Sequence, residues 1–124
     1  MSEQAPFNIL WLEEDDGIAS LVRVSAKKWF PGANVFVAET PAQAEEFLSR
    51  NVPNIVFGEI WEGSGIHKGF RELMLRVRER HPECRLAIVS THENLAHHVP
   101  GAEHMRKPFN PAKFRKFYHE SMRG

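Results

Sequence analysis

Five polar side chains stand directly after short apolar runs of this sequence, where their chemistry could be combined. They are two neighbouring acids, Glu13 and Glu14, a third acid, Glu59, a hydroxyl, Ser90, and a cation, Lys107. Carboxylates can bind a divalent cation or move protons. Lysine and hydroxyl groups can bind phosphoryl oxygens. The set predicts a polar site if the fold brings these distant positions together.

The apolar runs alternate with amphipathic segments, which favours a doubly wound α/β fold. Strands that are apolar throughout and separated by helices indicate a parallel sheet covered on both faces. The carboxyl ends of such strands meet at one edge of the sheet, where sites form. We expect a three-layer, five-stranded parallel sheet with strands at 9–12, 35–37, 55–57, 86–89 and, more weakly, 104–106.

Helical spacing of apolar residues predicts the segments between these strands. The first helix has Ile18, Leu21, Val22, Ser25 and Trp29 at that spacing, and the second begins at Thr40-Pro41. A loop carrying Gly63 and Gly65 is expected after the third strand. A third helix has its stripe at 70–77, and the last helix opens at Asn110-Pro111 with Phe114, Phe117 and Tyr118 inward.

Length and charge bound the class of protein. A chain of 124 residues fits one domain, here 1–124 with its core at about 8–122. Lys plus Arg and Asp plus Glu both total 16, so the net charge is zero. The overall charge therefore gives no indication of nucleic acid or membrane binding. Cys84 is the only cysteine, which fits a reducing compartment. With no apolar run of membrane-spanning length and no signal peptide at the start, a cytoplasmic protein is expected.

The ordered set of polar residues resembles the receiver domains of two-component response regulators, over nearly the whole chain from Asn8 to about Met122. The resemblance implies a flavodoxin-like (β/α)5 fold and signalling by phosphotransfer. It also implies roles for particular positions: the acidic pair at Glu13 and Glu14, the phosphoacceptor position at Glu59, the hydroxyl at Ser90, the lysine motif at Lys107-Pro108-Phe109, and the switch position at His104.

Two departures from the family pattern change the expected chemistry. Glu14 and Glu59 replace the usual aspartates, and each moves a carboxylate outward by one methylene. Magnesium requires near-ideal octahedral geometry, so we expect weak Mg²⁺ binding, no required cofactor and no efficient phosphotransfer. Glu59 could act as a built-in mimic of a phosphoryl group that reaches toward Lys107 and Ser90. Alternatively, it has lost its role and is a solvated loop acid paired with Lys107.

The segment between Ser90 and Lys107 is shorter than the family's, and it contains Pro100-Gly101. Only 93–98 is free to be helical, so the fourth helix is expected to be shortened or lost. His104 replaces the family's Tyr or Phe. It is either a pH sensor or a side chain without a sensing role.

Three further groups of residues have side chains that could form a site. A zinc site at His92, His97, His98 and His104 lacks the usual ligand spacing, so no metal site is expected. Trp61 is either a partner-binding anchor or a lid over the polar site. The basic residues near the end of the chain are interpreted as a solvated helix face: Arg106, Lys107, Lys113, Arg115, Lys116 and Arg123.

The favoured hypothesis is a degenerate receiver, a pseudo-receiver that binds a protein partner and is not an enzyme. One alternative is a working receiver that a histidine kinase phosphorylates with Mg²⁺. The other is a small α/β enzyme that uses the acids with Lys107. A protein partner is expected, without nucleic acid or membrane, and the oligomeric state stays open.

Overall fold

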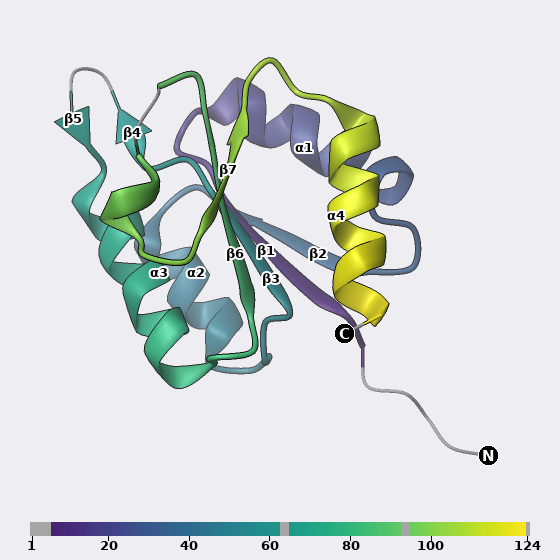
Figure 1. Ribbon diagram of the computed structural model, residues 1–124, viewed down its shortest axis with the longest axis horizontal. Coiled ribbons are helices and arrows are strands. Elements are labelled where there is room, and N and C mark those ends of the chain that lie inside the picture. The colour runs from purple at the N-terminus through teal and green to yellow at the C-terminus, as the bar shows by residue number, and fades with distance from the viewer. Residues whose placement is uncertain (1–5, 63–64, 93–94, 124) are drawn as a thin grey trace.

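Five strands form one parallel sheet in the order β2-β1-β3-β6-β7. The computed structural model describes residues 6–62, 65–92 and 95–123. Chain order reverses between β1 and β3, which is where doubly wound sheets place their sites. The predicted fold class is confirmed (Figure 1). The strands are β1 Asn8–Leu12, β2 Asn34–Ala38, β3 Ile55–Gly58, β6 Arg85–Ser90 and β7 Glu103–Arg106.

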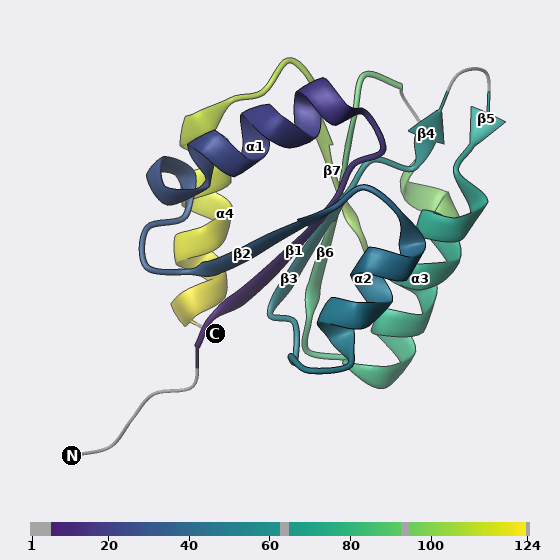
Figure 2. The same ribbon diagram turned by 180° about the vertical axis from the view of Figure 1, so that it is seen from behind.

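Helices cover both faces of this sheet (Figures 1 and 2). On one face lie α1, Asp16–Trp29, and α4, Pro111–Arg123; on the other lie α2, Pro41–Leu48, and α3, Lys68–Arg80. Side chains cap the helix starts: Asp15 accepts the Ile18 N–H at 2.9 Å. No helix among the described residues is long and apolar enough to cross a bilayer.

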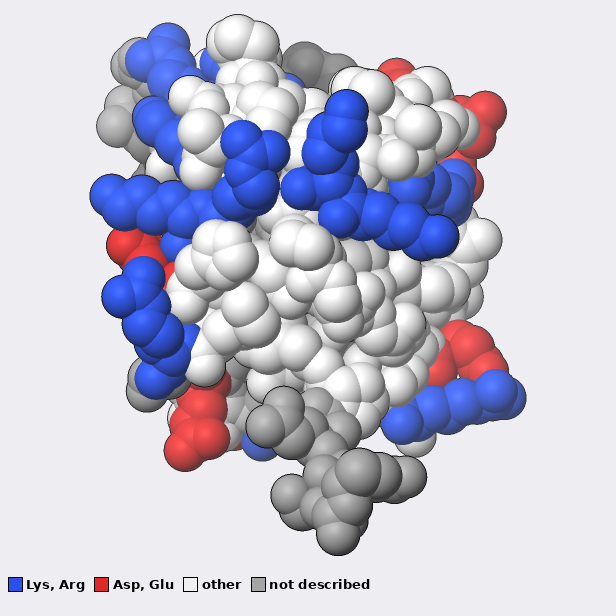
Figure 3. All heavy atoms as spheres, turned by 90° about the vertical axis from the view of Figure 1, so that its right-hand side faces the viewer, with Lys and Arg blue, Asp and Glu red and all other residues white. Residues whose placement is uncertain are grey.

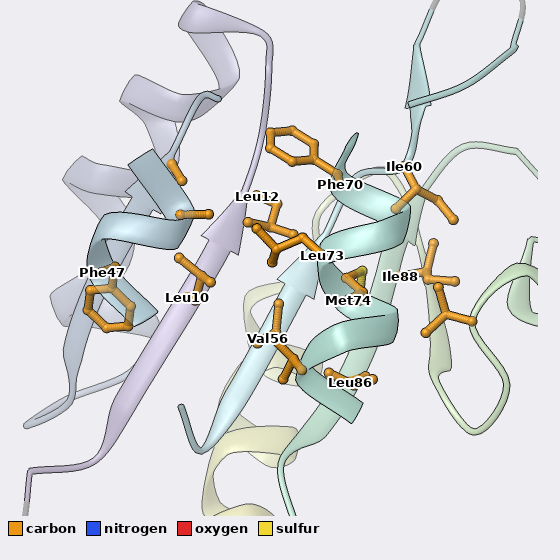
Figure 4. Packing of buried hydrophobic residues seen from close by; sticks show 14 of the residues in the cluster. Leu10, Leu12, Phe47, Val56, Ile60, Phe70, Leu73, Met74, Leu86 and Ile88 are labelled. Atoms are coloured by element: carbon orange, nitrogen blue, oxygen red, sulfur yellow. The ribbon is translucent and has the colours of Figure 1, made fainter. Parts of the chain in front are cut away.

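The core is divided into two clusters because alternate strand residues point to opposite faces. Leu10, Leu12, Val56 and Ile88 pack with α2 and α3 (Figure 4). The residues between them, including Trp11, pack with α1 and α4. The buried strands therefore hold their carboxyl ends in fixed positions beside one another.

Gly58, the last residue of β3, allows α3 to lie close to the strand end that carries Glu59. A Cβ at Gly58 would stand 2.6 Å from the Met74 Sδ and 3.5 Å from the Leu12 Cδ1. The close approach favours glycine at this point, since a larger residue would require the flexible end of the Met74 side chain to move (Figure 4).

Two details of the sequence prediction need correction. The loop expected after the third strand is wrong at Trp61–Glu62 and Gly65–Ile66, which pair antiparallel as β4 and β5; Gly63 lies outside the described residues. The His67 N–H donates to the Ile60 carbonyl at 2.7 Å and closes this ribbon. Leu21, expected inward, is 49% exposed, because the buried stripe of α1 is Ala19, Val22, Ala26 and Trp29.

The helix that the receiver family has between the last two strands, here between β6 and β7, is replaced by a single 3₁₀ turn, Ala96–His98. The expectation that this helix is shortened or lost is therefore confirmed for the described residues. Residues 93–94, part of the stretch considered for a helix, lie outside that description. Leu95 and Val99 anchor the turn in the core beneath it. Helix α3 and strand β6 therefore keep an apolar cover although the helix is missing.

Candidate functional site

A cavity of about 350 Å³ opens at the carboxyl edge of the sheet. The ends of β1, β3 and β7 deliver polar residues to it, and β4 and the start of α3 form its rim. The sheet edge predicted from sequence therefore gathers four of the five singled-out polar residues. The lining comprises Glu13, Glu14, Asp15, Ile18, Glu59, Trp61, His67 and Lys107.

Lys107 lies between two of the acids. Its Nζ is 3.2 Å from the Glu59 Oε2 and 3.6 Å from the Glu13 Oε1. The three side chains are 14%, 12% and 3% exposed, for Lys107, Glu59 and Glu13 respectively. Because little water screens them, these charges interact more strongly than a surface pair does. The ammonium holds the two carboxylates together as one buried charge cluster.

Glu13 is the most deeply placed acid of this cluster. Burial raises its pKa above the ordinary value, although the Lys107 charge and the Asp15 N–H act in the opposite direction. Its Oε2 accepts the Asp15 N–H at 3.2 Å, while its Oε1 has no hydrogen-bond partner among the described residues. Glu13 is therefore held by the charge of Lys107 and by one backbone group.

The raised pKa makes a prediction about stability. Folded Glu13 binds its proton more tightly than unfolded Glu13, so its contribution is fully present below the unfolded pKa and is lost as the pH rises through the folded pKa. In chemical unfolding from about pH 4 to about pH 7, wild-type stability should fall relative to that of Glu13→Gln. The exposed Glu79 offers a matched control, because the stability difference between the wild type and Glu79→Gln should not change with pH over the same range. If the stability difference between the wild type and Glu13→Gln were also independent of pH, the raised pKa of Glu13 would be contradicted.

Glu59 connects the charge cluster to the neighbouring ribbon. Its Oε1 accepts the Trp61 N–H at 2.9 Å, and the Trp61 ring stacks on His92 with centroids 3.6 Å apart. The His92 N–H donates to the Ser90 Oγ at 3.0 Å, and the Lys107 N–H donates to the Ser90 carbonyl at 3.1 Å. These contacts, with the Lys107–Glu59 pair, form a closed ring that joins the ends of β3, β6 and β7 through β4.

The other predicted site residues take different places. Ser90 is buried and belongs to that ring, but it is not among the cavity's lining residues. The Glu14 side chain lines the cavity and is 55% exposed. His104 pairs in register with Ile88, and its buried Nε2 has no hydrogen-bond partner among the described residues. Trp61 is half-buried at the cavity rim, so it is positioned as part of the wall.

Sequence reasoning missed His67, which lies at the start of α3. Its Nδ1 accepts the Phe70 N–H at 3.1 Å, so the proton of the neutral ring is on Nε2, which lies 3.6 Å from the Glu14 Oε2. The ring also stacks on Phe70. The available signal was its position three residues before the first buried residue of the helical stripe, a helix-capping position.

Carboxylate and imidazole side chains are the groups that could hold a metal ion at this edge of the sheet. Among the described residues, no group of three or more His, Cys, Asp or Glu side chains is placed to hold a metal ion. The Lys107 ammonium already lies between Glu13 and Glu59, so a divalent cation there would meet a like charge. The histidines considered for zinc form no such group either; His97 and His98 contact each other in the 3₁₀ turn.

Cys84 does not contribute a reactive thiol. Burial raises its pKa to about 12, so the thiol stays protonated near neutral pH. Its Sγ lies 3.6 Å from the Arg85 carbonyl, at the start of β6 and away from the polar edge. The structure thus supports a packing role for this residue.

Comparison with known proteins gives matches at the level of structure. No protein-family model matches the chain, and no curated protein matches it. A response regulator from Thermotoga maritima superposes with a TM-score of 0.75 and 22% identity, over 97% of this chain and 100% of that one. A receiver domain protein from Clostridium thermocellum superposes with a TM-score of 0.75 and 14% identity, and the alignment covers 94% of each chain. A beryllofluoride-activated receiver domain, DrrB, superposes with a TM-score of 0.73 and 15% identity, over 97% of this chain and 100% of that one. The chain therefore has the fold of response regulator receiver domains.

Proposed function

We propose that this chain is a receiver-like signalling domain that acts by binding a protein partner, without phosphorylation of its acid pocket. The observation that carries the proposal is the contact of the Lys107 Nζ with both Glu59 and Glu13. An internal ammonium neutralises the carboxylates that a cation would otherwise bind. The Glu59 oxygens are each engaged, one by Lys107 and one by the Trp61 N–H.

The same contacts support a structural role for Glu59. Only 12% of the Glu59 side chain is exposed, which favours a buried structural contact over a solvated loop acid. It ties Lys107 at the end of β7 to the ribbon at Trp61, so it holds one arrangement of this edge without a signal. A permanently held arrangement is what a built-in mimic would provide for partner binding.

The lining of the cavity argues against the enzyme alternative. Small-molecule sites are lined mostly by apolar side chains with a few placed polar groups. Here the proportions are reversed, because Ile18 and Trp61 are the only residues of the lining that are not titratable. The polar residues are largely paired with one another, which leaves them poorly suited to a reacting substrate.

The proposal predicts that the protein does not bind a phosphoryl analogue. Trp61 lines the cavity while Trp11 and Trp29 are buried in the core, so tryptophan fluorescence should report events at this site. Titration with beryllofluoride and Mg²⁺ up to about 10 mM is expected to give no saturable change. The Trp61→Phe variant identifies any signal that arises elsewhere.

A saturable response that disappears in Glu59→Gln would place the analogue at the acid pocket. That result would overturn the proposal in favour of the working receiver. A response that persists in Glu59→Gln but disappears in Trp61→Phe would place the analogue on another acid of the pocket, Glu13 or Glu14, and would overturn the proposal equally. A response that persists in both variants arises elsewhere and leaves the proposal standing.

A further inference from the structure

The face made by α1 and α4 carries an excess of positive charge in a chain that is neutral overall. These two helices together hold seven Lys or Arg residues and two acids, whereas α2 and α3 together hold five Lys or Arg residues and four acids. Figure 3 shows Lys and Arg side chains in a belt across this side, with acids at its margins. We call five of these residues the basic face: Lys27, Lys28, Lys113, Arg115 and Lys116.

Internal contacts do not explain the basic face. None of its five residues forms an ion pair within the part of the chain that the structure describes, whereas Arg23 pairs with Glu39 and Arg85 with Glu120. Lys113 lies in the first turn of α4, which contains no acid. A cation is unfavourable there because the helix dipole is positive at that end. Helix stability is therefore not the reason for its charge.

Exposed apolar side chains border Lys27, Lys28 and Arg115 of the basic face, whereas Lys113 and Lys116 lie toward β7 on the other side of α4. Leu21 and Val24 on α1 are 49% and 84% exposed, and Met122 on α4 is 45% exposed. Met122 is seven residues after Arg115, on the side of α4 that carries Tyr118, whose hydroxyl donates to the Pro31 carbonyl just after α1. The surface thus combines cations with separate apolar groups on two adjacent helices.

We propose that the α1–α4 face binds an acidic, amphipathic segment of a partner protein. Carboxylates would complement the cations, and the apolar side of the segment would cover Leu21, Val24 and Met122. Nucleic acid is less well matched, because it offers no aliphatic side chains to cover Leu21, Val24 and Met122, and an anionic membrane is distinguished by the test below. The inference names a surface for the proposed partner binding, and it does not depend on the state of Glu59.

A binding measurement with defined probes tests this surface. The probe is a labelled helical peptide with Glu on one side and Leu on the other, followed by fluorescence anisotropy. Saturable binding is expected, and Lys28→Glu combined with Arg115→Glu should weaken it about tenfold, because these cations lie beside Leu21 and Met122. Neither residue forms an ion pair within the described part of the chain, so this variant should stay folded. Unfolding curves check that expectation.

The matched control reverses two exposed cations of α3, Lys68→Glu with Arg80→Glu, and should change peptide affinity less than about twofold. Equal losses in the two variants, or no saturable peptide binding, would overturn the proposal. So would tighter binding of duplex DNA or of anionic vesicles than of the peptide at the same salt concentration. None of these results bears on the beryllofluoride test, so the two proposals can fail separately.

Discussion

Replacement of Trp11 by alanine is expected to cost about 3–5 kcal/mol of unfolding free energy. Trp11 is fully buried in β1, an interior strand of the sheet. Its ring centroid lies 4.8–6.4 Å from the ring centroids of Phe57, Phe114, Phe109, Trp29 and Phe30. The substitution therefore removes the common centre of an aromatic cluster between the sheet and two helices. Urea unfolding followed by circular dichroism measures the loss.

The control for this prediction is Val24→Ala, at an apolar side chain that is 84% exposed on α1. It should change stability by less than about 0.5 kcal/mol. A cost below about 1 kcal/mol for Trp11→Ala would mean that the cluster around β1 is not the centre of the core.

Replacement of Lys107 by methionine is expected to destabilise the protein by about 3 kcal/mol near neutral pH. Methionine keeps much of the apolar stem but leaves Glu59 and Glu13 without their shared counter-charge. Two buried carboxylates then face each other and lose the attraction that offset their desolvation. Because protonation removes one of these charges, the loss should shrink toward about pH 4.

A double variant separates the charge effect from packing. Adding Glu59→Gln to Lys107→Met should recover about 1 kcal/mol, because one uncompensated charge is removed. If the single and double variants have the same stability at every pH, Lys107 acts through its methylene groups and the charge cluster is not a stabilising unit.

Much of the fold could be predicted from the sequence because its signals are local. The apolar runs of β1, β3 and β6 are buried on both faces, and the capping residues Thr40 and Asn110 mark the starts of α2 and α4. The β4–β5 ribbon could not be predicted. Its strands have two residues each, too short for a periodic pattern, and a long-range bond from His67 to Ile60 closes it.

The candidate site was predictable by position but not by contact. Strand ends identified Glu13, Glu14, Glu59 and Lys107 as neighbours, since a parallel sheet brings its carboxyl ends to one edge. Both alternatives for Glu59 place it beside Lys107, as the structure does, but the sequence could not say that Glu13 would share the same ammonium, because this depends on the rotamers of side chains from three strands. For the same reason, the path from Ser90 to Glu59 through His92 and Trp61 had no signal in the sequence.

In the proposed function, Lys107 occupies the acid pocket internally and the domain signals without accepting phosphate. Its most direct test is intact-mass spectrometry of the protein after incubation with acetyl phosphate and Mg²⁺, with the Thermotoga maritima response regulator treated in parallel for comparison. The account predicts that the mass of this protein stays unchanged. An added phosphoryl group that maps to Glu13, Glu14 or Glu59 would contradict it.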